Sequence, residues 1–183
     1  MQVIATALPD VLLLKPRVFA DERGYFMETW NQRVYAEHGL DLHFVQDNHS
    51  RSHRHTLRGL HYQVVQPQGK LVSVSRGEVY DVVVDVRKNS PTFGQWAAEI
   101  LSEDNHHLLW IPPGFAHGFY VLSEVADIHY KCTDFYAPEH ERCIRWDDPA
   151  LAISWPIEDG VAPRLSVRDG QGVFLSVAEP VAC

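Results

Sequence analysis

The residues most able to do chemistry lie in one short stretch, Leu57-Arg58-Gly59-Leu60-His61-Tyr62-Gln63, and just beyond it at Lys70. In a strand, His61 and Gln63 share one face, and Leu60 and Tyr62 share the other. An arginine can hold an anion, a histidine can exchange a proton near neutral pH, and a lysine can stabilise an oxyanion. The stretch therefore indicates acid–base chemistry on an anionic substrate. The plainer alternative is a strand with a hydrogen-bonded core histidine and two solvated cations.

Two other segments offer polar groups to a ligand. Gln46 and Asn48 would share one strand face and present their amides, although an edge strand with outward polar positions explains them equally well. Arg23 lies in the turn Asp21-Glu22-Arg23-Gly24, beside Tyr25 and Phe26. It is either an anion clamp next to an aromatic platform or a surface turn residue.

Most of the elements that must position these groups are expected to be strands. Alternating segments at 70–75, 79–87, 96–101, 108–111, 115–122 and 126–135 are separated by turn signals. One short helix is expected over Asn31–His38, capped by Asn31 and stopped by Gly39. Residues 1–20 are expected to be extended, and 137–183 are Pro-rich and irregular. Short strands at this spacing predict a sandwich or barrel.

The run Pro112-Pro113-Gly114-Phe115-Ala116-His117 resembles the second signature of the cupin jelly rolls. Metal-binding cupins supply His-x-His and a Glu from their first signature. This chain has Gln63 where the second histidine would stand, and no clear Glu follows. Two histidines are too few ligands for a divalent ion. The expected fold is therefore an all-β, cupin-type jelly-roll barrel with a few short helices and no bound metal.

Bulk properties restrict the class further. At 183 residues the natural expectation is one domain, spanning 1–183. The formal net charge of -8 argues against nucleic-acid or anionic-membrane partners. The three cysteines, Cys132, Cys143 and Cys183, show neither disulfide nor zinc-knuckle spacing, which fits reduced thiols in the cytosol. With no signal peptide and no 18-residue apolar run, a cytoplasmic protein is expected.

Several motifs occur in a specific order: Asp21-x-Arg23-Gly24-x-Phe26-x-Glu28, Gln46-Asp47-Asn48-x-Ser50, Leu57 to Gln63, Lys70, Arg76-Gly77-Glu78-Val79, Pro113 to Phe119, Tyr130-x-Cys132 and Leu165-Ser166-x-x-Asp169. From about residue 3 to about 170 the chain resembles the dTDP-4-dehydrorhamnose 3,5-epimerase family. This family uses no cofactor and serves dTDP-L-rhamnose biosynthesis. A tail from about 171 lies outside the resemblance and is expected to be peripheral.

The resemblance implies a role for each matching position. His61 is implied as the general base, Asp169 as the carboxylate that orients it, Tyr130 as the general acid on the opposite face of the sugar, and Lys70 as the group at the C4 oxygen. Pyrophosphate contacts are implied for Arg23, Arg58 and Arg168, and thymine stacking for Tyr136. The other implied substrate-binding positions are Phe26, Glu28, Gln46, Asp47, Asn48, His117 and Glu141. The family commonly has Lys where this chain has Arg168, which keeps the charge but changes the donor geometry.

The implied reaction converts dTDP-4-dehydro-6-deoxy-D-glucose to dTDP-4-dehydro-L-rhamnose. The C4 ketone acidifies the C3 and C5 protons, so inversion needs one base, an oxyanion donor and a second proton donor on the opposite face. On the residues alone, Tyr130 is more simply a core aromatic and Asp169 a turn residue. Asp85 is an alternative partner for His61. The resemblance also implies a homodimer in which N-terminal residues such as Phe26 reach the partner's site.

Three alternatives remain open. A 3- or 5-mono-epimerase, or a 3,4-ketoisomerase, would keep the barrel and most pyrophosphate contacts. A non-catalytic cupin that binds nucleotide sugars is disfavoured by the combination of His61, Lys70 and Tyr130. A metal-dependent cupin oxygenase is disfavoured by Gln63.

Overall fold

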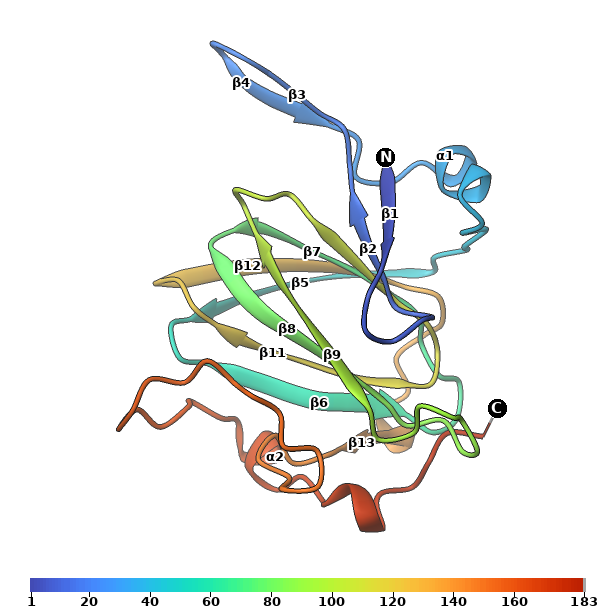
Figure 1. Cartoon of the computed structure of the whole chain (residues 1–183), viewed down its shortest axis with the longest axis vertical. Helices are drawn as coiled ribbons and strands as arrows, with labels where there is room; N and C mark the ends of the chain where they lie inside the picture. The colour runs from blue at the N-terminus through green and yellow to red at the C-terminus, as the bar shows by residue number, and fades with distance from the viewer. Residues whose placement is uncertain (183) are drawn as a thin grey trace.

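Two antiparallel sheets face each other and enclose the core (Figure 1). The computed structural model describes residues 1–182. One sheet has the order β1 (Gln2–Ala5), β2 (Leu12–Lys15), β10 (Leu108–Ile111), β7 (Lys70–Arg76), β12 (Val125–Cys132), β5 (Gln46–His53). The other has the order β13 (Glu141–Cys143), β6 (Leu57–Gln63), β11 (Phe115–Val121), β8 (Glu78–Asp85), β9 (Trp96–Ser102). This is the expected all-β jelly roll.

Side-chain alternation along each strand divides the apolar residues between two layers. Val79 and Val83 of β8 face the other sheet and join the core between the sheets, with Leu109, Phe119 and others. Tyr80, Val82, Val84 and Val86 face outward and pack in a second cluster under the C-terminal segment. The alternation expected over 79–87 is confirmed, because a period of two sends successive side chains to opposite sides of a sheet.

The C-terminal segment lies along the outside of the five-stranded sheet (Figure 1). Val181 is buried and forms an isolated bridge with Arg87. The Tyr62 hydroxyl donates to the Glu179 carbonyl at 2.7 Å. This segment includes α2 (Val167–Gly170) and two 3-10 turns, Pro138–His140 and Leu175–Val177. Residues beyond 171 thus cover outward-facing apolar side chains of the barrel. Cys183 lies outside the described residues.

The expected helix is present as α1 (Gln32–Glu37). The Asn31 side chain caps it by accepting from the backbone amides of Arg33 and Val34, and Gly39 follows with a φ of 82°. Tyr35 packs with Leu14, Trp110 and neighbouring side chains at the end of the six-stranded sheet. Capping and one apolar face are therefore enough to explain this element.

Two elements were missed in the sequence, and a third is longer than expected. Strand β5 continues from Gln46 and Asn48, which were expected on a strand face, through the polar residues 49–53. It is an edge strand that pairs with β12, and its outward side chains Asp47, His49, Arg51 and His53 are exposed to water. Strand β13 and helix α2 lie in the segment expected to be irregular. Both are too short for a periodic pattern and depend on pairing with β6 and on the Ser166 cap.

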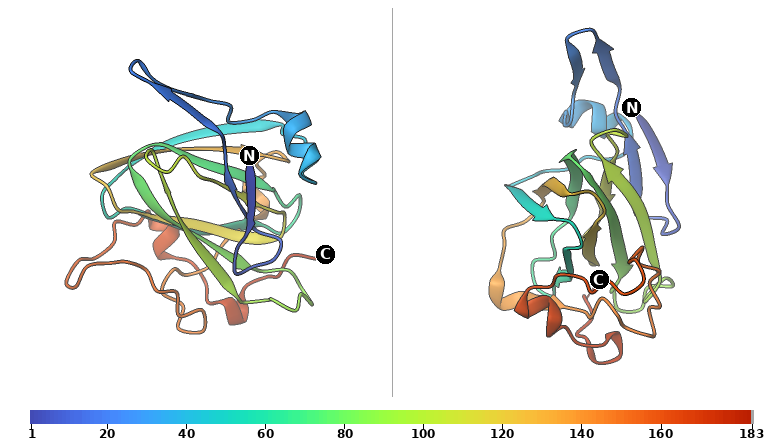
Figure 2. Two further views of the ribbon diagram at one scale, coloured as in Figure 1. Left: turned by 45° about the horizontal axis from the view of Figure 1, so that its top comes forward. Right: turned by 90° about the vertical axis from the view of Figure 1, so that its left-hand side faces the viewer.

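A separate hairpin, β3 (Val18–Asp21) and β4 (Gly24–Met27), projects away from the barrel (Figure 2). It carries Phe19, Tyr25 and Phe26, and the Phe26 side chain is 69% exposed. Large aromatic groups at an exposed tip mark an interaction surface more often than isolated exposed residues do. In residues 1–182, no helix is long and apolar enough to span a membrane.

Asp85 connects the end of β8 to the following turn. Its carboxylate is buried and accepts from Arg87, Ser90 and Thr92, with the last two donors at 2.6 Å. Burial opposes ionisation, but these hydrogen bonds prevail and lower the Asp85 pKa to about 2. The ionised carboxylate therefore stabilises the fold.

We predict that Asp85→Asn lowers the free energy of unfolding by about 2 kcal/mol at pH 7, because buried donors lose an anionic acceptor. Since the pKa is depressed in the folded state, this contribution is complete above about pH 4 and is lost as the pH falls toward 2. Urea unfolding across that range measures it. Asp10→Asn, which removes an exposed carboxylate from the same Arg87, should cost under about 1 kcal/mol. If the difference in unfolding free energy between wild type and Asp85→Asn does not change with pH, this account is contradicted.

Candidate active site

An open cavity of roughly 330 Å³ lies between the two sheets. One wall belongs to the five-stranded sheet and its neighbours and the other to the six-stranded sheet. The first wall contributes Arg58, His61, Gln63, His117 and Glu141, and the second contributes Gln46, Asn48, Lys70 and Tyr130. The expected faces are confirmed: His61 and Gln63 line the cavity, and Leu60 and Tyr62 pack in the outer cluster.

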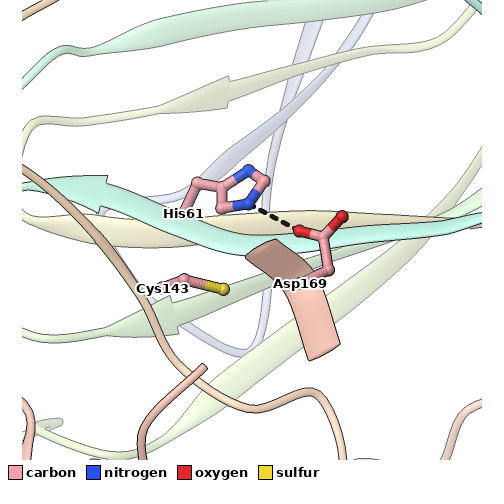
Figure 3. Close-up of side chains that lie close together, drawn as sticks. All are labelled: His61, Cys143 and Asp169. Atoms are coloured by element: carbon pink, nitrogen blue, oxygen red, sulfur yellow. Dashed lines mark ion pairs between the residues drawn. The ribbon is translucent and has the colours of Figure 1, made fainter. Parts of the chain in front are cut away.

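His61 lies against Asp169 (Figure 3). The imidazole Nε2 is 2.7 Å from Asp169 Oδ1, and Nδ1 points away from the carboxylate. Asp169 also accepts from the Ser166 hydroxyl at 2.6 Å and from the Gly59 amide at 3.1 Å. Burial opposes ionisation of this carboxyl, but the contacts with His61, Ser166 and Gly59 lower its pKa to about 2. Asp169 is therefore an anion that fixes the histidine ring, and the alternative partner Asp85 is wrong because it pairs with Arg87.

Lys70 and Tyr130 lie on the wall opposite His61. Lys70 opens β7, and Tyr130 lies on the adjacent strand β12. Burial lowers the Lys70 pKa, although the nearby Cys132 and Glu141 oppose this effect. Burial raises the Tyr130 pKa, so the phenol is protonated at neutral pH and can donate. A cation and a neutral proton donor thus face a histidine across the same space.

A second histidine, His117, lies directly opposite His61 in the pairing of β11 with β6. Its Nε2 is 2.9 Å from both oxygens of Asp81, and both side chains are buried. Burial raises the Asp81 pKa, and the contact with His117 opposes that shift. Asp81 was not among the site residues expected from the sequence.

Glycine permits the close approach of β6 to β11 behind the two histidines. A Cβ at Gly59 would lie 2.5 Å from the Gly118 Cα and 2.7 Å from the His117 carbonyl oxygen. Gly59 also has a φ of 114°, which other residues rarely adopt. The Arg58-Gly59-Leu60-His61 sequence therefore serves the backbone geometry as well as the chemistry.

Gln63 does not serve as a metal ligand. Its amide donates to the carbonyls of Gln66 and Phe135, and its oxygen accepts from the Ala137 amide at 3.0 Å. These bonds hold the loop that carries Tyr136. The residues at the cupin metal position therefore do not fit a divalent ion, since Gln63 stands where a second histidine would be needed and its side-chain amide is held by this loop.

Charged and aromatic groups line the mouth of the cavity. The Tyr136 hydroxyl donates to Glu141 at 2.6 Å, and Arg168 forms an ion pair with Glu141. The Gln46 side chain accepts from the Tyr136 amide, and Arg58 donates to the Ser52 hydroxyl at 3.0 Å. The mouth can therefore bind a ligand with an anionic group and a flat ring.

Six expected site residues do not line this cavity themselves. Two of them contact residues that do, since Asp169 lies against His61 and Arg168 pairs with Glu141, and the other four lie elsewhere. Arg23 and Phe26 lie on the projecting hairpin, and Glu28, just after it, accepts from Asn31. Asp47 points to the other side of β5 and pairs with Lys131 at 2.9 Å. The reason is the strand period: Gln46 and Asn48 face the cavity, so Asp47 between them cannot. The expected roles of these four in substrate binding stay predictions, and for Phe26 the expected site is that of a partner chain.

The fold and the cavity define a cupin-type jelly-roll protein equipped for proton transfer on an anionic ligand. A family profile described as dTDP-4-dehydrorhamnose 3,5-epimerase matches residues 5–176. A dTDP-4-dehydrorhamnose 3,5-epimerase from Pseudomonas aeruginosa is 60% identical over 180 residues, covering 98% of each chain. The chain therefore belongs to the dTDP-4-dehydrorhamnose 3,5-epimerase family.

Solved structures agree with this assignment. A dTDP-6-deoxy-D-glucose-3,5-epimerase from Legionella pneumophila, in complex with dTDP-4-keto-L-rhamnose, superposes with a TM-score of 0.93 at 50% identity. The match covers 97% of this chain and 94% of that one. A 3'-monoepimerase from Streptomyces bikiniensis, in complex with dTDP-quinovose, gives a TM-score of 0.87 at 33% identity over 94% of this chain and 87% of its own. The fold alone thus does not distinguish double from single epimerisation.

Proposed function

We propose that this protein inverts both C3 and C5 of dTDP-4-dehydro-6-deoxy-D-glucose to give dTDP-4-dehydro-L-rhamnose, as an isomerase of dTDP-L-rhamnose biosynthesis. One observation carries the mechanism: His61 belongs to one wall of the cavity, and Tyr130 and Lys70 to the other. A sugar ring held between the walls presents one face to a base and the opposite face to a proton donor. Inversion requires that arrangement, because a proton returned to the face it left restores the starting configuration.

The proposed steps use only the residues of this chain. His61 removes the proton next to the C4 ketone through Nδ1, while Asp169 holds Nε2. The electrons move to the C4 oxygen, and the Lys70 ammonium stabilises the resulting enolate. Tyr130 then returns a proton to the other face of the same carbon. The sequence repeats at the second carbon once solvent has restored both groups, and no cofactor is needed because the ketone itself acidifies both positions.

Substrate binding follows from the mouth of the cavity. Arg58 and Arg168 can neutralise the pyrophosphate, and the exposed Tyr136 ring can stack on thymine. Gln46, Asn48, His117 and Glu141 are positioned to contact the sugar. Because the protein carries a net charge of -8, these local cations are needed to offset its repulsion of an anionic substrate.

The test is turnover of dTDP-4-dehydro-6-deoxy-D-glucose in deuterated water, followed by NMR of the product. Epimerisation of both carbons places solvent deuterium at C3 and C5. A mono-epimerase would label and invert one carbon only, and a binding module would label neither. Either result would reject the double epimerisation.

We further propose that the protein works as a cytoplasmic homodimer of single epimerase domains. The projecting hairpin with exposed Phe19 and Phe26 needs a partner to cover it, and the missing contacts of Arg23, Phe26 and Glu28 would come from a second chain. The free Cys132 and Cys143 are compatible with a reducing compartment.

His61→Asn should abolish deuterium exchange at both carbons, because one base serves both. The expected loss is about 10²–10⁴-fold, the usual contribution of a general base. Exchange rates by NMR, with circular dichroism to check the fold, give the measurement. Residual exchange within about tenfold of wild type would show that another group is the base.

Tyr130→Phe should separate exchange from inversion. His61 could still remove a proton and return one to the same face. Some incorporation of solvent deuterium (wash-in) should therefore remain, while net epimerisation falls much further. The informative quantity is the ratio of deuterium wash-in to epimer formed in one sample. If both rates fall together and the ratio stays at the wild-type value, Tyr130 positions the sugar or the base instead of donating the proton.

If the hairpin reaches the partner's site, Phe26→Ser should raise the KM for the dTDP-sugar by about tenfold. A change of that size is typical for the loss of one moderate interface contact. Val177→Ser is the matched control, since Val177 is also highly exposed but lies on the C-terminal 3-10 turn. Steady-state kinetics and sedimentation velocity test the two claims separately. A monomeric wild-type protein with full activity would reject the shared site.

A further inference from the structure

The Cys143 thiol lies beside the His61–Asp169 pair, and no step of the epimerisation assigns it a role. Burial, with the nearby Asp169, raises the pKa of this thiol to about 12, so it is protonated until a metal ion displaces the proton. Cys143 lies directly opposite His61 in the pairing of β13 with β6, so their side chains share the cavity side of the sheet. A ring nitrogen of His61, the Cys143 sulfur and an Asp169 oxygen all lie within 4.8 Å of one another (Figure 3). Nitrogen, sulfur and oxygen donors at this spacing form the donor set of a soft or borderline metal ion.

We propose that His61, Cys143 and Asp169 form an inhibitory site for a soft divalent cation such as Zn²⁺ or Cd²⁺. The bound ion would occupy the nitrogen that now faces Asp169, and it would replace the carboxylate contact that orients the base. The site goes beyond the proposed function, because metal binding there would be a means of stopping proton transfer and no part of catalysis.

The geometry needs only small side-chain movements. Tetrahedral zinc holds nitrogen and oxygen at about 2.0–2.2 Å and sulfur at about 2.3 Å, which places the donor atoms about 3.3–3.6 Å apart. His61 Nε2 and Asp169 Oδ1, now 2.7 Å apart, would separate by about 0.6 Å. The longest of the present separations, at most 4.8 Å, would shorten by about 1 Å. A water molecule from the cavity could supply the fourth ligand.

Charge favours thiophilic ions over the common hard ones. A thiolate and the Asp169 carboxylate together balance a divalent charge, and neutral imidazole adds no charge. The thiol proton passes to solvent when the ion binds, as is usual for thiolate ligands. Mg²⁺ and Ca²⁺ prefer oxygen ligands and gain little from the sulfur or the imidazole. The nearby Arg168 further disfavours any cation that cannot bind the thiolate strongly.

This position differs from the one used by metal-binding cupins. Only His61 belongs to the first cupin signature, whereas Cys143 comes from β13 and Asp169 from α2. Gln63 and His117 take no part, since the donor atoms that lie close together belong to His61, Cys143 and Asp169. The site therefore exists because the C-terminal segment folds back onto β6.

In the test, metal-free protein is titrated with Cd²⁺. Equilibrium dialysis measures how much Cd²⁺ binds, and the ultraviolet charge-transfer band of a cadmium thiolate shows whether a cysteine is a ligand. Wild type should bind one Cd²⁺ per chain with the band, and Mg²⁺ should not compete. Cys143→Ser should lose the band and at least about tenfold in affinity, since even outer-shell changes cost that much. Cys143→Ala provides a second variant. Cys132→Ser is the matched control and should retain both signals, because Cys132 lies elsewhere, beside Asn48.

A second arm measures turnover. Without metal, Cys143→Ser should keep activity close to that of wild type, and it should resist concentrations of Cd²⁺ that inhibit wild type. A band that persists in both Cys143 variants, a band lost instead in Cys132→Ser, or no binding by wild type would overturn the proposal. The binding arm needs no substrate, so a failure of the proposed epimerase function would remain distinguishable from a failure of this site.

Discussion

The contact between Asp169 and His61 depends on long-range folding. The two residues lie on β6 and on a four-residue helix near the end of the chain, and Gly59 bonds to a carboxylate 110 residues away. The connection holds because the outward apolar side chains of the five-stranded sheet need a cover, and the C-terminal segment supplies it. Burial of Leu151 and Val181 thus positions α2, and α2 delivers the carboxylate to the histidine. The hydrophobic packing that buries the C-terminal segment therefore also brings Asp169 to His61.

Charge is distributed to serve this arrangement. The chain as a whole is acidic, yet Lys70 and Arg58 line the cavity, and Arg168 lies beside it on Glu141, where an anionic sugar nucleotide would bind. Lys70 lies in the buried part of that cavity, where low polarity strengthens its attraction for a developing oxyanion. Asp169 and Asp81 each contact a histidine, so these two carboxyl groups orient side chains of the site and do not themselves line the cavity.

Much of the barrel could be predicted from strand alternation. The two faces of β8, the boundaries of β10 and the cap of α1 follow from local residue patterns. Local patterns could not show whether Asp169 or Asp85 is the partner of His61, because both aspartates are distant from His61 in sequence. Only family resemblance favoured Asp169. Asp81 and Cys143 were missed for the same reason: strand pairing, which no short motif encodes, brings each beside a histidine.

The central claim is that the sugar lies between a base on one sheet and a donor on the other. The most direct measurement is a crystal structure of His61→Asn with dTDP-4-dehydro-6-deoxy-D-glucose bound. We predict that the residue at 61 and the Tyr130 hydroxyl approach opposite faces of the ring, each within about 3.5 Å of C3 or C5, a distance suited to reaction. The Lys70 ammonium should lie within hydrogen-bond distance of the C4 oxygen. A sugar with both groups on one face, or with Tyr130 out of reach of either carbon, would contradict the account.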